Sequence, residues 1–166
     1  MKNHGLYQLF IEELEEAFDA EREMHRCISG WAHQASSAEL KQFLHKHQKE
    51  TDTQVKRLDK VFSLLHIHAE GKVSETMRGL LRESEDEKRE SPGTLDAAII
   101  CSILKIKHYE MASYRTLIGL ARHLHLDAQV VDLLTTIWNE EKSADAVLFK
   151  IIEGLNFESS DQVVNQ

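Results

Sequence analysis

Apolar residues recur at every third or fourth position along most of this chain, the spacing that places them on one face of an α-helix. The pattern predicts four long helices, at about residues 7–33, 38–65, 94–123 and 128–153, and a shorter helix that begins near residue 74. Seven glycines and a single proline leave few positions at which a helix would break. We therefore expect an all-α protein.

The connection between the second and third long helices, at about residues 66–94, is much longer than the other two. It carries the short helix and a charged run, RESEDEKRES (82–91), which we expect to face solvent. We expect Pro92-Gly93 to end this segment and Thr94 to cap the third long helix. Two antiparallel helix pairs joined in this way are typical of four-helix bundles with a long crossover, the ferritin-like folds among them.

Length and composition narrow the class of protein further. The 166 residues suffice for one compact domain, which we expect at residues 1–156, with 157–166 as a flexible tail. A net charge of −8 disfavours non-specific nucleic-acid binding. No apolar run approaches the ~20 residues of a membrane span, and acids interrupt the first apolar stretch, which argues against a signal peptide. We expect a cytoplasmic protein that binds neither nucleic acid nor membrane.

Charged residues interrupt the apolar faces of all four long helices. Glu21, Glu110 and Glu141 fall on the inward faces of the first, third and fourth helices, and Asp145 follows Glu141 by about one turn. The second helix has three polar inward turns in succession, at His47, at Glu50 or Thr51, and at Gln54. An unpaired charge in a protein core is costly, so we expect these positions to form a functional site.

The glutamates also fall at matching heights along the predicted bundle. Glu21 and Glu50 lie equally far from the turn between the first two helices, as do Glu110 and Glu141 from the last turn. Buried carboxylates in one layer repel each other unless protons or cations neutralise them, and hard or borderline metal ions are the usual solution. The alternative is that some of these acids fall near the inward face by chance. His47, three residues before Glu50, is either close to a metal or a core histidine.

Four segments carry a resemblance that covers about residues 7–156. They are HQKETDTQVKRLDKVF (47–62), MRGLLRESEDE (77–87), DAAIICSILKIKHYEMASYRTL (96–117) and LLTTIWNEEKSADAVL (133–148). These segments resemble the YciE/YciF family of ferritin-like proteins. The resemblance implies a four-helix bundle with an additional crossover helix, a homodimer, a dinuclear metal site and a link to bacterial stress responses. It brings no assigned reaction.

The acidic constellation of that family is present in this chain. Its members are Glu21, His47, Glu50, Glu110, Glu141 and Asp145. The departure is Lys107, at a position where the family usually has a glutamate one turn before Glu110. Lys107 and Asp145 are roughly level across the predicted helix pair, so we expect an ion pair between them. An ammonium group at a ligand position would repel a metal ion bound nearby.

The neighbours of Glu110 have other expected roles. His108 lies 200° around the helix from Glu110, so we expect it to contribute to packing between helices or between subunits. Tyr109 and Tyr114 flank the expected site. We expect them to be core aromatic residues, with a hydrogen bond from one of them to a carboxylate as the alternative.

Two functions are consistent with these observations. The first is a ferritin-like stress-response protein that binds one or two iron or manganese ions and, if active, is a di-iron-type oxidoreductase working on oxygen or peroxide. Glu21 and Glu110 would be terminal ligands, and Glu50 and Glu141 bridging or chelating ones. Lys107 argues against full dinuclear redox catalysis. The second is a metal-free, non-catalytic homodimer that acts by protein–protein interaction.

Overall fold

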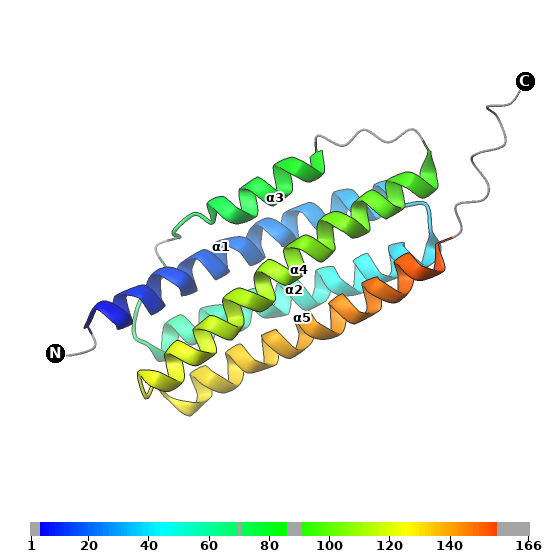
Figure 1. Cartoon of the computed structure of the whole chain (residues 1–166). Coiled ribbons are helices and arrows are strands. Elements are labelled where there is room, and N and C mark those ends of the chain that lie inside the picture. The colour runs from blue at the N-terminus through cyan, green and yellow to red at the C-terminus, as the bar shows by residue number, and fades with distance from the viewer. Residues whose placement is uncertain (1–3, 70, 86–90, 156–166) are drawn as a thin grey trace, which may run out of the picture.

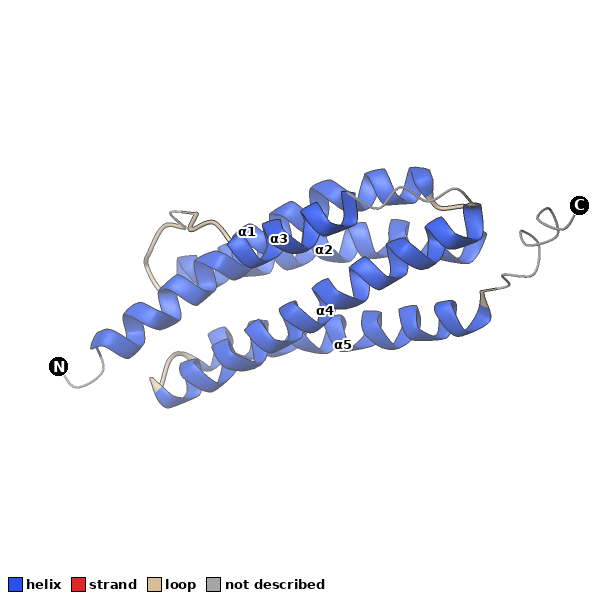
Figure 2. Ribbon diagram, turned by 45° about the horizontal axis from the view of Figure 1, so that its top comes forward, coloured by secondary structure: helices blue, strands red, loops and turns tan. Residues whose placement is uncertain are grey.

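The computed structural model describes residues 4–69, 71–85 and 91–155 (Figure 1). It contains five helices, α1 (His4–Gln34), α2 (Ala38–Leu64), α3 (Glu75–Glu85), α4 (Pro92–His123) and α5 (Ala128–Gly154). All regular secondary structure in the described part is helical (Figure 2), which confirms the predicted all-α class. Part of the charged run at 82–91 and the expected tail at 157–166 lie outside the described residues.

The four long helices form a bundle of two antiparallel hairpins. Helix α1 pairs with α2 and α4 with α5, while contacts between α1 and α4 and between α2 and α5 join the two hairpins. Helix α3 belongs to the crossover and packs against α4 and, less extensively, against α1 (Figure 1). The predicted four-helix bundle, with a long crossover that carries a short helix, is therefore confirmed.

Short polar side chains determine where the helices begin. The Ser37 hydroxyl accepts a backbone hydrogen bond in the first turn of α2, and Ser74 does so at the start of α3. Helix α4 begins earlier than predicted, because Ser91 rather than Thr94 is its cap. Pro92 occupies the first turn, where its fixed φ suits the helix and its missing N–H costs no hydrogen bond.

The core consists of two apolar clusters separated by a polar layer. One cluster lies toward the α1–α2 turn and includes Met24, Ile28, Leu44, Ile103 and Leu148. The other lies toward the α4–α5 turn and includes Phe10, Leu14, Leu58, Leu117 and Leu134. The polar layer between them consists of fully or almost fully buried side chains, Glu21, His47, Thr51, Gln54, Lys107, Glu110 and Glu141.

Two inward faces differ from the prediction by one residue. On α2, Thr51 is buried, whereas the side chain of Glu50 is 31% exposed. On α5, Ala144 is buried in place of Asp145, whose side chain is 26% exposed. Apolar positions alternate at spacings of three and four along a packed helix, and a face read one residue out of register satisfies the same spacing. Of the two alternatives for α2, Thr51 rather than Glu50 faces inward, and the predicted inward position of Asp145 on α5 is wrong.

Candidate functional site

Lys107 lies at the centre of the polar layer, and its side chain has no exposed surface. Its Nζ is 2.5 Å from Oε2 of Glu110, one turn further along α4. The same ammonium group donates a hydrogen bond to Oε2 of Glu141 on α5. A single lysine thus joins two buried carboxyl groups from neighbouring helices.

Glu21 extends the layer to α1. The Tyr114 hydroxyl donates a hydrogen bond of 2.6 Å to Oε1 of Glu21, and both side chains are buried. Tyr114 is therefore the carboxylate donor that the sequence left as an alternative, rather than a plain core aromatic residue. Tyr109, by contrast, bonds with Ser74 at the start of α3, 2.7 Å between the two oxygens.

Gln54 connects the layer to the surface between α2 and α5. Its Nε2 donates to Oε1 of Glu141 at 2.7 Å and to Oε2 of Glu140 at 3.1 Å. Glu140 in turn accepts two hydrogen bonds from Nη1 of Arg57, at 2.7 and 2.8 Å. Glu140 and Arg57 were not predicted from the sequence, because both lie beside the inward faces rather than on them. Their opposite charges on facing helices were the available signal.

His47 and Glu50 form a second connection from the interior to the surface. Nδ1 of His47 lies 3.5 Å from Oε2 of Glu50, and the buried imidazole stacks on Phe43 with 5.4 Å between ring centroids. Oε1 of Glu50 is also 3.3 Å from Nζ of Lys46, which is largely exposed. Glu50 therefore lies at the edge of the layer and does not join Glu21, Glu110 and Glu141 within it.

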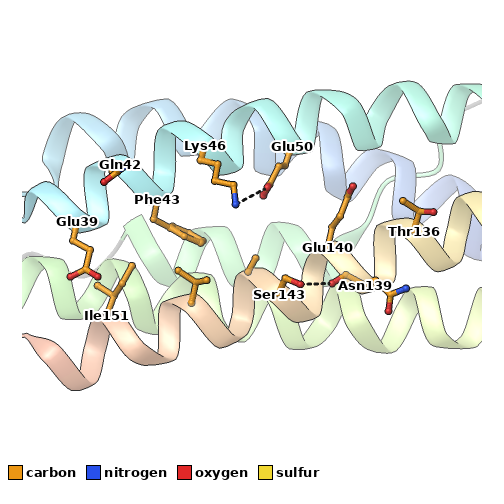
Figure 3. Close-up of a pocket in the computed structure, with 12 residues that line it drawn as sticks. Glu39, Gln42, Phe43, Lys46, Glu50, Thr136, Asn139, Glu140, Ser143 and Ile151 are labelled. Atoms are coloured by element: carbon orange, nitrogen blue, oxygen red, sulfur yellow. Dashed lines mark hydrogen bonds and ion pairs between the residues drawn. The ribbon is translucent and has the colours of Figure 1, made fainter.

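A groove of about 640 Å³ runs between α2 and α5 beside this edge (Figure 3). Glu50 and Glu140 line it, together with apolar side chains that include Phe43, Val147 and Ile151. Both surface connections of the buried layer therefore end in the same groove.

The predicted Lys107–Asp145 ion pair is wrong. Asp145 instead lies with Oδ1 3.2 Å from Nε2 of His108, whose side chain is 70% exposed. The register of α5 explains the difference, since Glu141 occupies the buried position and Asp145 turns to the outer side. His108 links α4 to α5 at the surface, in agreement with its expected role between helices.

The charges within the layer balance each other. Burial, together with the negative charge of Glu141, raises the pKa of Glu21 to about 8, and burial also raises the pKa of Glu110 well above its usual value. Burial opposes ionisation of Glu141, but the Lys107 ammonium outweighs it and lowers the pKa of Glu141. Burial likewise disfavours charge on Lys107, but the carboxylates of Glu110, Glu141 and Glu21 raise its pKa. The Lys107 ammonium thus favours the charged form of Glu141, while burial favours the uncharged forms of Glu21 and Glu110.

Several buried polar atoms of the layer have no hydrogen-bond partner among the described residues. They are Oε2 of Glu21, Oε1 of Glu110, Nε2 of His47 and Oε1 of Gln54. Burial, followed by the charge of Lys107, also lowers the pKa of His47, so its imidazole is neutral near pH 7. These atoms are of the type that could coordinate a cation.

The residues do not fit the dinuclear metal centre that the family resemblance implies. Lys107 places a positive charge between Glu110 and Glu141, the two carboxylates from α4 and α5 that such a centre would need. Glu50 pairs with Lys46 and His47 at the surface instead. Within residues 4–69, 71–85 and 91–155, no group of three or more His, Cys, Asp or Glu side chains is arranged to hold a metal ion.

Fold and site together define a class, a crossover four-helix bundle whose core contains a charge-balanced layer of one lysine and several carboxyl groups. The family profile described as "Domain of unknown function (DUF892)" matches residues 5–160, and the chain belongs to this family. It is also 34% identical to the protein YciF of Escherichia coli over 151 residues, 89% of this chain and 90% of that protein. The resemblance to the YciE/YciF family is thereby confirmed.

Solved structures support the same relationship. The E. coli stress protein YciF matches with a TM-score of 0.85 and 31% identity, over 89% of this chain and 94% of that one. YcfI of Rhodopseudomonas palustris, described as a candidate structural protein, matches with a TM-score of 0.84 and 34% identity, over 87% and 92% of the two chains. A protein of Xanthomonas campestris shares the fold at 19% identity, with a TM-score of 0.68 over 90% and 91%.

The helices of the described part do not include one with the length and apolarity needed to cross a membrane.

Proposed function

We propose that this chain is a cytoplasmic stress-associated bundle protein that acts without a metal and without catalysis, through contacts with other protein molecules. The first partner we propose is a second copy of the chain, as the family resemblance implies. The association with stress is supported by the similarity to the E. coli stress protein YciF. A structural role agrees with the description of the R. palustris relative.

The observation that carries this proposal is the charge balance of the buried layer. The Lys107 ammonium contacts Glu110 and Glu141, so the chain itself supplies the cation that its buried carboxylates need. Two unit charges 4 Å apart interact by roughly 4 kcal/mol at an effective dielectric constant of 20, and a divalent ion would be repelled about twice as strongly. A metal ion in this layer would therefore have to displace Lys107 or remove its proton.

The rival function is the metal-dependent one, and one observation favours it. Oε2 of Glu21, Oε1 of Glu110 and Nε2 of His47 are buried without a hydrogen-bond partner in the described part of the chain. These atoms would be the ligands of an iron or manganese ion, with Glu141 as a fourth and Glu50 reaching in from the edge. Such an ion would supply oxygen or peroxide chemistry, but the Lys107 ammonium would repel it.

Metal analysis of the native protein separates the two functions. The chain is produced in cells supplied with iron and manganese and purified without a chelator, and its metal content is measured by inductively coupled plasma mass spectrometry. We expect less than about 0.1 equivalent of either metal, because the ammonium repels a cation. One or two tightly held equivalents that survive dialysis would overturn the proposal in favour of the metal-dependent function.

A further inference from the structure

We propose that the outer face of α2, in its N-terminal half, is a docking surface for an acidic helix of another protein, one with Asp or Glu at every fourth position. The surface consists of Lys41, His45 and Lys49 on α2 and His25 on α1, and we call it the basic face. The inference deepens the proposed function, on which it rests, because it gives the chemistry of a partner other than a second copy.

The basic face is a local excess of positive charge in an acidic protein. The chain has a net charge of −8, and α1 carries seven Asp and Glu against two Lys and Arg. Helix α2 reverses this balance, with six Lys and Arg against four Asp and Glu. Lys41, His45 and Lys49 are four residues apart and share one stripe of the helix. The nearby acids Glu39 and Glu50 lie roughly 120° or more around the helix from His45, so they do not interrupt the stripe.

The chain does not neutralise the lysines of the basic face. Lys41, His45 and Lys49 are exposed, and neither lysine has an ion-pair partner within residues 4–69, 71–85 and 91–155. Other cations of α2 do pair with acids of the chain, Lys46 with Glu50, Lys56 with Asp52 and Arg57 with Glu140. Lys41 and Lys49 therefore remain available to carboxylates from outside.

Two surface hollows of about 560 Å³ each meet at His45. One lies between α1 and α2, where His25, Lys49 and the amide of Gln48 line it together with His45. The other follows α2 and is lined by Lys41, His45 and Lys49 among others. Lysine stems present apolar surface beside their charges, and imidazole and amide groups can donate hydrogen bonds to carboxylates. The hollows thus give room to side chains on either side of a row of carboxylates.

The spacing of the cationic stripe matches that of a helix. Positions four residues apart lie about 6 Å apart along the axis, so Lys41 and Lys49 are separated by about 12 Å. A partner helix with acids at positions i, i+4 and i+8 presents carboxylates at the same intervals, and lying along α2 it can face all three side chains at once. Exposed ion pairs are individually weak, so the shared register gives the contact its specificity.

Other anionic partners fit the basic face less well. A DNA duplex carries a charge about every 1.7 Å along its axis, so it would extend past Lys49 to Asp52 and meet the field of an acidic protein. Anionic membranes are typically bound by clusters of about four to eight Lys and Arg, whereas this face has two lysines. A short acidic helix avoids both mismatches.

A second copy of the chain does not supply such a helix from α1, although α1 is the most acidic of the four long helices. Its acids at four-residue spacing are already engaged within the chain. Glu12 and Glu16 pair with Lys72, Asp19 accepts a hydrogen bond from the Ser74 N–H, and Glu23 pairs with Arg26. The acidic partner of the basic face is therefore a different protein.

The test measures binding of a fluorescent synthetic helical peptide by anisotropy. The peptide carries three glutamates four residues apart on one face, and a control peptide of the same composition has them distributed around the helix. The proteins are wild type, a double variant with Lys41→Gln and Lys49→Gln, and a matched control with Lys56→Gln and Lys60→Gln. The control loses the same charge further along α2. A DNA duplex serves as a second anionic probe, and circular dichroism checks that each variant folds.

We expect wild type to bind the peptide with the row of glutamates, and the Lys41/Lys49 double variant to bind it roughly tenfold more weakly. The Lys56/Lys60 control should stay within about twofold of wild type, since Lys56 is already paired with Asp52. The peptide with distributed glutamates and the DNA duplex should bind wild type more weakly. Raising the salt from about 20 to 300 mM should weaken the specific complex, because the charges are exposed.

Four results would each overturn the inference. They are no saturable binding by wild type, an equal loss in the Lys56/Lys60 control, equal binding of the peptide with distributed glutamates, and tighter binding of DNA than of the peptide. If the Lys41/Lys49 double variant does not fold, the single variant Lys49→Gln decides by the same comparison.

The metal content of the native chain tests the proposed function separately. A metal-free chain that does not bind the peptide rejects this inference alone, whereas a chain purified with tightly held iron or manganese rejects the proposed function whatever the peptide result.

Discussion

At the residue scale, the central question is how a fully buried lysine keeps its charge. An isolated ammonium in a protein core would lose its proton rather than remain charged. Lys107 avoids this because the charges of Glu110, Glu141 and Glu21 together outweigh the cost of burial and raise its pKa. Burial in turn raises the pKa of Glu21 and of Glu110, so fewer negative charges remain in the layer for Lys107 to balance.

Removing the Tyr114 hydroxyl should destabilise the protein. Tyr114→Phe keeps the ring in the core but leaves Oε1 of Glu21 without its donor. We expect the free energy of unfolding to fall by about 1–3 kcal/mol, the usual penalty for a buried polar atom left without a partner. Urea unfolding followed by circular dichroism measures it. Equal stability of variant and wild type would show that the hydroxyl does not hold Glu21.

Ionisation of Glu21 should lower the free energy of unfolding as the pH rises. Its pKa is about 8 in the folded chain, against an ordinary value of 4.5, so the folded state retains a proton that the unfolded state loses between these values. The contribution of Glu21 to stability is therefore most favourable below pH 4.5 and declines up to about pH 8. Glu21→Gln, which cannot ionise and still accepts from Tyr114, should match wild type near pH 4.5 and exceed it at pH 8–9.

Glu50→Gln provides the contrast for this pH experiment. The hydrogen bond with His47 lowers the pKa of Glu50, so its carboxylate contributes stability above its ordinary pKa and loses it as the pH falls. Glu50→Gln should therefore be less stable than wild type at neutral pH, with the difference shrinking toward acid pH. Urea unfolding at several pH values compares both variants. A Glu21→Gln variant with the same pH dependence as wild type would contradict the raised pKa.

At the element scale, the helices could be predicted from the sequence more reliably than the faces they bury. Three- and four-residue spacing identified all five helices, but the same spacing fits two neighbouring registers on α2 and α5. Burial of Thr51 and Ala144 rather than Glu50 and Asp145 is decided by packing between the hairpins, which a single helix cannot reveal. The inward face of α1 contains Glu21 between apolar turns, and it was predicted correctly.

Asp96 shows how one side chain positions two elements. Its Oδ1 accepts a 2.7 Å hydrogen bond from the Ser36 backbone N–H, and its Oδ2 accepts from the Ser37 N–H at 2.7 Å and from the Ser36 hydroxyl at 2.8 Å. The carboxyl group of α4 thereby holds the turn between α1 and α2. These partners lie about 60 residues away in the sequence, so helical spacing could not reveal them.

Asp96→Ala should therefore loosen the junction of the two hairpins. All three hydrogen bonds are lost, and two backbone N–H groups lose their acceptor, so we expect a loss of about 2–4 kcal/mol in the free energy of unfolding. Ser36→Ala is the matched control, since it removes one of the three bonds and should cost about 1 kcal/mol. Urea unfolding measures both variants. A smaller effect for Asp96→Ala than for Ser36→Ala would refute this role.

At the scale of the whole molecule, the bundle brings together the side chains of the polar layer, and only some of these contacts could be predicted from the sequence. The matching heights predicted that Glu21, Glu50, Glu110 and Glu141 share one layer. The structure places Glu21, Glu110 and Glu141 together around Lys107 and leaves Glu50 at the edge. The partner of Lys107 was not predictable, because Glu141 and Asp145 are about one turn apart and the register of α5 decides between them. The connections through Gln54 to Glu140 depend on side-chain directions that helical spacing does not specify.

The proposed homodimer should bury the exposed apolar side chains of α5, Val147 and Phe149. Leu9, Val147 and Phe149 are the large apolar residues exposed in the described part of the chain, and Val147 also lines the α2–α5 groove. We expect light scattering after size exclusion to give twice the chain mass. Val147→Glu should shift this mass toward the monomer, while Leu9→Glu on α1 serves as the matched control. A monomeric wild-type chain would reject the dimer.

The most direct test of whether Lys107 takes the place of a metal ion is diffraction from crystals of the wild-type chain grown with millimolar Mn²⁺, with data collected at the manganese absorption edge. We expect no anomalous peak in the polar layer, with the Lys107 ammonium between Glu110 and Glu141. An anomalous peak between these two carboxylates, with Lys107 turned away from them, would contradict the claim that the chain supplies its own cation.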